Sequence, residues 1–168
     1  MTWTAPDAVR IDEPFVADER TMLVGFLDYA RATLLLKCAG LTADQLAERA
    51  VPPSALSLLG LVRHAADVER NWFRRRFAGQ DVPPLYGKDP AFDDARPEGA
   101  EQDLATLLAE QEECRRAVAD LPLDFVWVNP QYGPMSLRWV LLHMVDEYAR
   151  HNGHADLLRE RIDGRTGD

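Results

Sequence analysis

Four long segments of this 168-residue chain place apolar residues three or four positions apart, which is the spacing of one face of an α-helix. They cover about residues 18–37, 57–77, 101–120 and 136–162. No segment between them shows the sustained alternation expected of a half-buried sheet. We therefore expect an all-α fold, built as a four-helix bundle with long loops.

Residues that commonly begin or end helices flank these segments. Gly40 and Gly79 follow the first two, where a glycine easily adopts the left-handed backbone of a helix end. Pro122 ends the third segment, and Ser136 is a good N-terminal cap for the fourth. Each predicted helix therefore has at least one defined boundary.

The connections between the helices differ in character. Residues 42–48 predict one or two helical turns, and Pro52-Pro53 then breaks the chain. Residues 80–98 are rich in proline, aspartate and glycine and predict a long loop. Residues 125–128 predict a short extended piece, and 129–134 a turn after it.

The net charge and the cysteines indicate which binding partners and which cellular compartment to expect for this protein. The length predicts one domain over 1–168, and the net charge of −9 disfavours nucleic acid and anionic membranes as partners. Cys38 and Cys114 belong to no zinc-ribbon spacing, so free thiols in a reducing compartment are the simplest interpretation. The N-terminal stretch lacks the apolar core of a signal peptide. We therefore expect a cytoplasmic protein.

All four histidines fall in two of the predicted helices. His64 lies in the second, and His143, His151 and His154 lie in the fourth. At about 100° per residue, these three histidines and Glu147 fan over only about 80° of the helix surface. That stripe borders the apolar face, so part of it points toward the bundle interior.

Two imidazoles and one carboxylate from these helices would suit a divalent metal. Glu147 and His151 are four residues apart and share a helix face, and His64 could complete a set of three. Such a set suits zinc, nickel or iron(II) and leaves coordination positions open. The spacing alone leaves another interpretation open: satisfied core histidines, with Glu147 solvated and paired with Arg150.

Two stretches resemble a known family. LVRHAADVERNWF (61–73) and HMVDEYARHNGHADLLRER (143–161) resemble the second and fourth helix motifs of the DinB/YfiT-like superfamily, in particular its uncharacterised actinobacterial branch. That branch is related to mycothiol-dependent maleylpyruvate isomerase. The resemblance implies a metal ligand set of His64, Glu147 and His151, with zinc or nickel fitting best and iron also compatible.

Four further residues are candidates for supporting roles around this set. The family pattern implies that His154 is a spare ligand or supports one, and that His143 packs beside the site. Asp67 could accept a proton from an imidazole or pair with a neighbouring arginine at the surface. Tyr148 could direct its hydroxyl into the pocket. The sequence identifies no catalytic residue.

The resemblance implies a metal-dependent transferase or isomerase that joins a small-molecule thiol of the mycothiol type to a small electrophilic substrate. It also implies a homodimer. A second hypothesis is a non-catalytic metal-binding or stress-response module, and a third is a dimeric helical scaffold without metal. Chelation separates the first two, because removal of a structural metal should unfold the helices.

Overall fold

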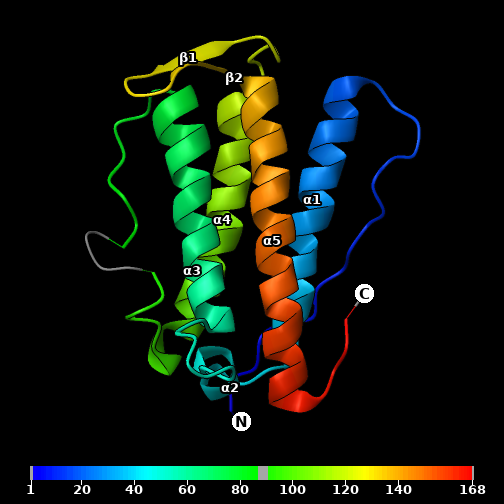
Figure 1. Ribbon diagram of the computed structural model, residues 1–168, viewed down its shortest axis with the longest axis vertical. Helices are drawn as coiled ribbons and strands as arrows, with labels where there is room; N and C mark the ends of the chain where they lie inside the picture. Colours follow the sequence, from blue (N-terminus) through cyan, green and yellow to red (C-terminus); the bar gives the residue numbers. More distant parts are fainter. Residues whose placement is uncertain (1, 87–90, 168) are drawn as a thin grey trace.

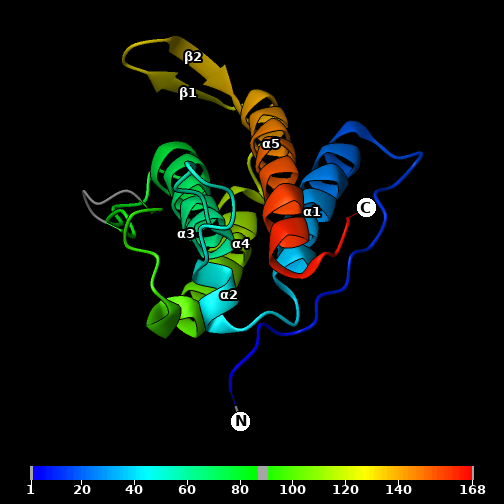
Figure 2. The same cartoon turned by 60° about the horizontal axis from the view of Figure 1, so that its bottom comes forward.

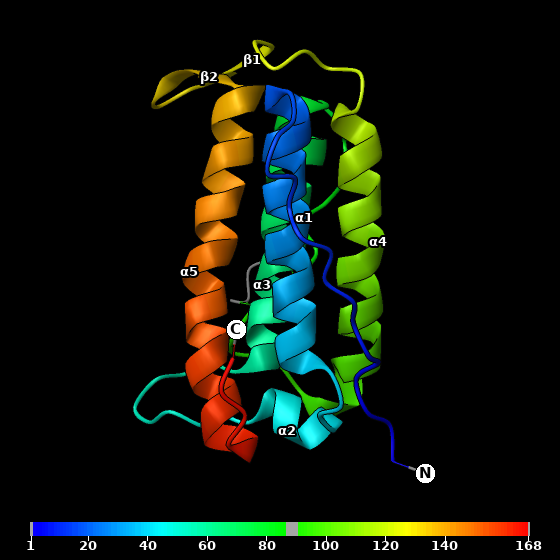
Figure 3. The same cartoon turned by 90° about the vertical axis from the view of Figure 1, so that its right-hand side faces the viewer.

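The computed structural model describes residues 2–86 and 91–167, so part of the predicted 80–98 loop (87–90) lies outside the described residues. The chain is mostly helical, as the sequence predicts (Figure 1). The long helices are α1 (Glu19–Cys38), α3 (Leu58–Glu69), which continues as η1 (Arg70–Phe77), α4 (Ala100–Val118) and α5 (Leu137–Asp163). They lie side by side, and α5 runs parallel to α1 and antiparallel to α3 (Figures 1 and 3).

Short elements close the two ends of the bundle. The predicted turns after Thr42 are the helix α2 (Ala43–Ala47), and a 3-10 turn, η2 (Pro97–Gly99), precedes α4. Figure 2 shows α2 at one end of the long helices and a hairpin at the other. The hairpin consists of β1 (Val126–Asn129) and β2 (Gly133–Ser136), which pair antiparallel.

The second strand of this hairpin was missed in the sequence. The expected extended piece is β1, but β2 has the sequence Gly-Pro-Met-Ser, which lacks the β-branched residues of a typical strand. Pro134 also has no amide hydrogen to donate, a property tolerated at a sheet edge. Gly133 takes the left-handed backbone that the turn requires, with φ of +82°.

The predicted helix boundaries are largely confirmed. The Ser136 hydroxyl accepts a hydrogen bond from the backbone amide of Trp139 and caps α5. Ser57 caps α3 in the same way through Gly60. Gly40 lies just past the end of α1 with φ of +75°, as expected for a glycine after a helix.

The second predicted helix changes geometry part of the way along. From Arg70 to Phe77 the backbone follows a π-helix, in which the amide of Ala78 donates to the carbonyl of Phe73, five residues earlier. The sequence predicted one regular helix here. Wide turns of this kind are rare and often lie at functional sites.

One core runs the length of the bundle. Leu34 of α1, Leu58 of α3, Leu107 of α4 and Met144 of α5 are all fully buried. The closest helix contacts are those of α1 with α5 and of α3 with α4, and α3 also packs on α5. Within the described part of the chain, no helix has the length and apolar character needed to cross a membrane.

Candidate metal centre

Three predicted ligands meet where α3 crosses α5. His64 Nε2 lies 3.0 Å from Glu147 Oε1, and His151 Nε2 lies 3.3 Å from the same oxygen. One donor atom from each side chain lies within 4.8 Å of the other two. We call these three residues the triad. Two imidazoles and a carboxylate at this separation fit a single divalent cation after small side-chain adjustments.

The helices hold the triad at the edge of the core. Glu147 and His151 project from successive turns of α5, while antiparallel packing brings His64 from α3 toward them. Leu61 and Met144 line the apolar space beneath the triad. The triad side chains stay 18–26% exposed, so they are partly open to solvent.

Electrostatics favour the protonation states that bind metals. Burial raises the pKa of Glu147, but the hydrogen bond from His64 and the nearby His151 outweigh burial and lower the pKa overall. Burial lowers the pKa of His151, and the neighbouring His64 lowers it further. An ionised carboxylate and a neutral imidazole are the forms required of metal ligands.

The other two histidines of α5 lie in different surroundings. Nδ1 of His154 lies 3.3 Å from Nδ1 of His151, so this residue can orient the imidazole of the triad. His143 stacks on Trp139 with ring centroids 4.9 Å apart, and meets the edge of Trp72 at 5.2 Å. His154 therefore adjoins the triad, and His143 belongs to an aromatic cluster.

Asp67 and Tyr148 make contacts that the sequence analysis did not anticipate. Asp67 Oδ1 accepts a hydrogen bond from the backbone amide of Leu85, so this carboxylate anchors the loop after η1. The hydroxyl of Tyr148 donates to Glu69 at 2.9 Å and accepts a bond from Gln111 at 3.1 Å. The ring of Tyr148 lines the space beneath the triad, but its hydroxyl points away from the triad toward Glu69.

Glu69 belongs to a buried ion pair that was not predicted from the sequence. Arg31 of α1 donates two hydrogen bonds to Glu69 of α3, and both side chains are almost completely buried. A signal was available, because each residue occupies an apolar position of its helix pattern. A charge in such a position requires a buried partner.

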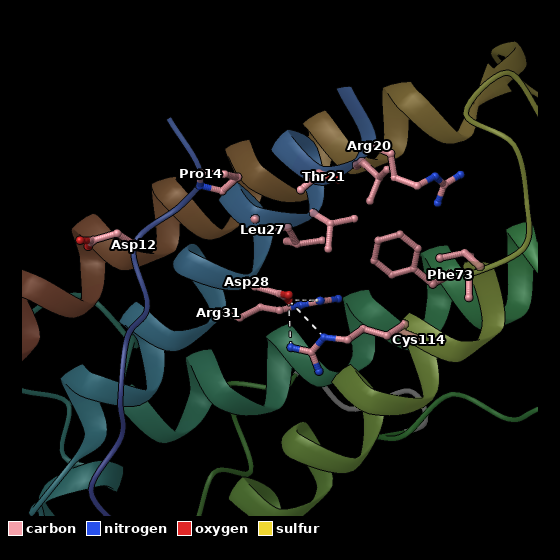
Figure 4. A pocket seen from close by; sticks show the side chains of 15 residues that line it. Asp12, Pro14, Arg20, Thr21, Leu27, Asp28, Arg31, Phe73 and Cys114 are labelled. Carbon is pink, nitrogen blue, oxygen red and sulfur yellow. Dashed lines mark hydrogen bonds and ion pairs between the residues drawn. The ribbon is translucent and has the colours of Figure 1, made fainter. Parts of the chain in front are cut away.

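A cavity of about 650 Å³ lies on another side of the bundle, between α1 and α4 (Figure 4). Its walls are mainly apolar, and Pro14 of the N-terminal segment contributes to its lining beside α1. Three of the charged side chains in it pair with each other, since Asp28 accepts hydrogen bonds from Arg31 and Arg115. The triad lies between the other two long helices, so this cavity does not open onto it.

Comparison with known proteins identifies the family and the fold. The family model described as mycothiol-S-transferase, a DinB-like family, matches residues 22–164, which include the whole triad. A conserved protein from Enterococcus faecalis has a similar crystal structure, with a TM-score of 0.59 at 18% identity. The similarity covers 89% of this chain and 100% of that chain, and it concerns the fold alone. The curated proteins gave no match.

Proposed function

This chain belongs to the mycothiol-S-transferase family, and on that premise we propose that it transfers a mycothiol-type thiol to a small electrophile at a metal centre. His64, Glu147 and His151 would hold the metal. The observation that carries the proposal is their convergence from two helices, with donor atoms within 4.8 Å and side chains 18–26% exposed.

The donor set favours zinc or nickel, and iron(II) is also compatible. Imidazole nitrogen suits all three ions, and the carboxylate offsets part of the positive charge. A divalent ion bound there would lower the pKa of a thiol that coordinates it. Three protein ligands leave room for that thiol, which is the arrangement of a catalytic rather than a closed structural site.

The surrounding residues would position the reactants and limit the water around them. Leu61 and Met144 keep the inner side of the triad apolar. In the transfer, the thiol proton leaves to solvent, the sulfur forms a bond to the electrophilic carbon, and the leaving group departs with its bonding electrons. The partly exposed triad side chains would let that proton pass to solvent. An isomerisation would also begin with a bond from sulfur to the electrophilic carbon, but no group would leave the substrate.

Metal analysis of the purified protein tests the centre. We expect about one divalent metal per chain in wild type and a large loss in His151→Ala. The control is Asp146→Asn, a change at an exposed carboxylate of the same helix. Absence of bound metal from wild type, even after supplementation, would refute the centre.

Cobalt substitution tests the chemistry. A thiol that binds the open position should perturb the cobalt absorption spectrum, and chelation should leave the helical circular dichroism intact. If chelation unfolds the helices, the metal is structural and the non-catalytic alternative is supported. If no low-molecular-weight thiol changes the spectrum, thiol transfer is refuted.

We also propose a homodimer. Large apolar side chains remain on the surface, including Phe15 and Val16 of the N-terminal segment, at 85% and 93% exposure. Contiguous apolar surface commonly marks a contact with another protein. Light scattering gives the mass in solution directly, and a monomer at micromolar concentration would contradict this proposal.

A further inference from the structure

An open groove lies where η1, the start of α5 and the β1–β2 hairpin meet. Its volume is about 670 Å³, within the usual range for small-molecule sites. Its lining combines aromatic rings with hydrogen-bonding groups: Trp72, Arg76, Asn129, Tyr132, Ser136 and Trp139. We call it the aromatic groove. It lies at the hairpin end of the long helices, since it is lined by the β1–β2 hairpin and the first turn of α5.

The aromatic rings form a cluster that is not fully covered. Trp72 and Trp139 meet edge to face with centroids 5.6 Å apart, and Trp127 meets Trp72 at 6.3 Å. Trp139 is still 42% exposed and Tyr132 is 70% exposed. Large aromatic side chains grouped on an open surface are typical of a ligand site.

The polar groups of the groove are available as hydrogen-bond donors. Asn129 Oδ1 already accepts bonds from the amides of Gln131 and Tyr132, so the Asn129 amide nitrogen is the part able to donate to a ligand. Ser136 Oγ accepts from the Trp139 amide, which leaves its hydroxyl hydrogen. Arg76 adds a guanidinium 4.1 Å from the Trp72 ring centroid. Such a set fits a ligand rich in hydroxyl oxygens.

The aromatic groove and the triad lie at different levels of the same two helices. Trp139 precedes Glu147 by eight residues on α5, and Trp72 follows His64 by eight residues on the other helix. Eight residues correspond to roughly 12 Å of helix rise. His143 lies between the two levels, in contact with both tryptophans.

We propose that the aromatic groove binds the sugar–cyclitol part of a mycothiol-type thiol whose sulfur lies at the triad. This inference rests on the proposed function. The extended cysteinyl arm of such a thiol spans about 6 Å before the first sugar ring. With the sulfur at the triad, the two rings would therefore extend over the roughly 12 Å that separate the triad from the groove. Polarised C–H groups of a sugar pack on the negative face of an indole ring, and its hydroxyls accept from the donors at the rim.

An aromatic electrophile is the competing occupant. It would use the indole faces but would leave the donors of Asn129 and Ser136 without acceptors. Desolvating such donors without replacing their hydrogen bonds lowers affinity. The combination of aromatic faces and donors therefore favours the polyol.

Titration with glucosaminyl-inositol, which carries no sulfur, tests the inference by calorimetry. Wild type and His151→Ala should bind it with equal affinity. Trp139→Ala and Tyr132→Ala should each bind it about tenfold more weakly, as expected for the loss of an aromatic contact. Leu157→Ala is the matched control, because it truncates an exposed apolar side chain on α5 outside the groove. Tyr132 is a hairpin side chain at 70% exposure, so its truncation should not unfold the protein.

A second titration separates the two proposals. N-acetylcysteine, which has no sugar, should perturb the cobalt spectrum equally in wild type and Trp139→Ala. Unchanged affinity for glucosaminyl-inositol in both aromatic variants, or absence of saturable binding in wild type, would overturn the groove assignment. So would preferential binding of a sulfur-free aromatic compound. A silent cobalt spectrum beside normal glucosaminyl-inositol binding would refute thiol transfer and support sugar recognition by the groove.

Discussion

Arg31 and Glu69 form an ion pair with two hydrogen bonds of 2.6 Å in the interior of the bundle, with side chains 3% and 0% exposed. Tyr148 adds a third hydrogen bond to the same carboxylate. The group therefore joins α1, α3 and α5 between the triad and the α1–α4 cavity. A buried pair of this kind is costly to disrupt from one side, because the remaining charge loses its buried partner.

Replacing Glu69 with alanine should lower the free energy of unfolding by about 3–5 kcal/mol, since the buried Arg31 guanidinium then keeps only the partly exposed Asp28 as a charged partner. Denaturant unfolding followed by circular dichroism measures this change. The matched control is Glu19→Ala, which removes a carboxylate paired with Arg138 at the surface. Exposed pairs contribute little, so that variant should unfold almost as wild type does. If both variants lose the same free energy of unfolding, the buried pair contributes no more to stability than the surface pair.

Glu147→Gln should weaken metal binding by at least about tenfold, because the amide keeps the shape of the side chain but loses the negative charge. Competition with a chromophoric chelator measures the affinity. Asp146→Asn makes the same chemical change at the preceding residue, whose carboxylate is 71% exposed and lies 3.7 Å from Arg150. It should bind metal as wild type does. If both variants bind equally, Glu147 is not a ligand.

Acid should destabilise the protein partly through Glu110. Burial raises the pKa of this carboxyl, but the hydrogen bond from Arg70 and the charges of Arg70 and Arg74 lower it below the ordinary 4.5. The folded state therefore holds this proton less tightly than the unfolded chain. The stabilisation is present above the unfolded pKa and is lost as the pH falls through the folded value. Unfolding free energies measured between about pH 5 and pH 3 should fall less steeply in Glu110→Gln than in wild type. Identical slopes would contradict this assignment.

The two cysteines should resist alkylation while the protein is folded. Burial raises the pKa of Cys38 to about 12 and also raises the pKa of Cys114 strongly. Because the thiolate is the reactive form, iodoacetamide at about pH 8 should modify them only after denaturation. Mass spectrometry gives the extent of labelling. Cys114 lines the α1–α4 cavity, so rapid labelling of this residue alone would show that the cavity opens to reagent.

The long helices were predictable because their signal is local and repeated. Apolar spacing and caps such as Ser136 define most of their boundaries. The hairpin was only half predictable, since the Gly-Pro sequence of β2 depends on its neighbour β1 for its extended form. The π-helix after Glu69 was not predictable, because one-face periodicity does not distinguish it from a regular helix over so few residues.

At the candidate site, spacing alone grouped His151 with Glu147, but also with His143 and His154. The family resemblance selected the set with His64, and that ligand set stays a prediction until metal is measured. Asp67 and Tyr148 could not be assigned from sequence, because their partners Leu85 and Glu69 come from segments whose positions depend on the whole fold. The aromatic groove likewise forms only where the hairpin meets two helices.

The π-helical stretch η1 determines the direction in which its groove residues point relative to His64 on α3. Each residue in a π-helix turns the chain through a smaller angle than in an α-helix, so Trp72 and Arg76 face a different direction from the one a regular helix would give them. Deleting one residue in this stretch would restore regular winding and rotate the groove residues of η1, while leaving His64 in place. A family with such a stretch could therefore change the molecule it recognises by gaining or losing a single codon, with its metal ligands untouched.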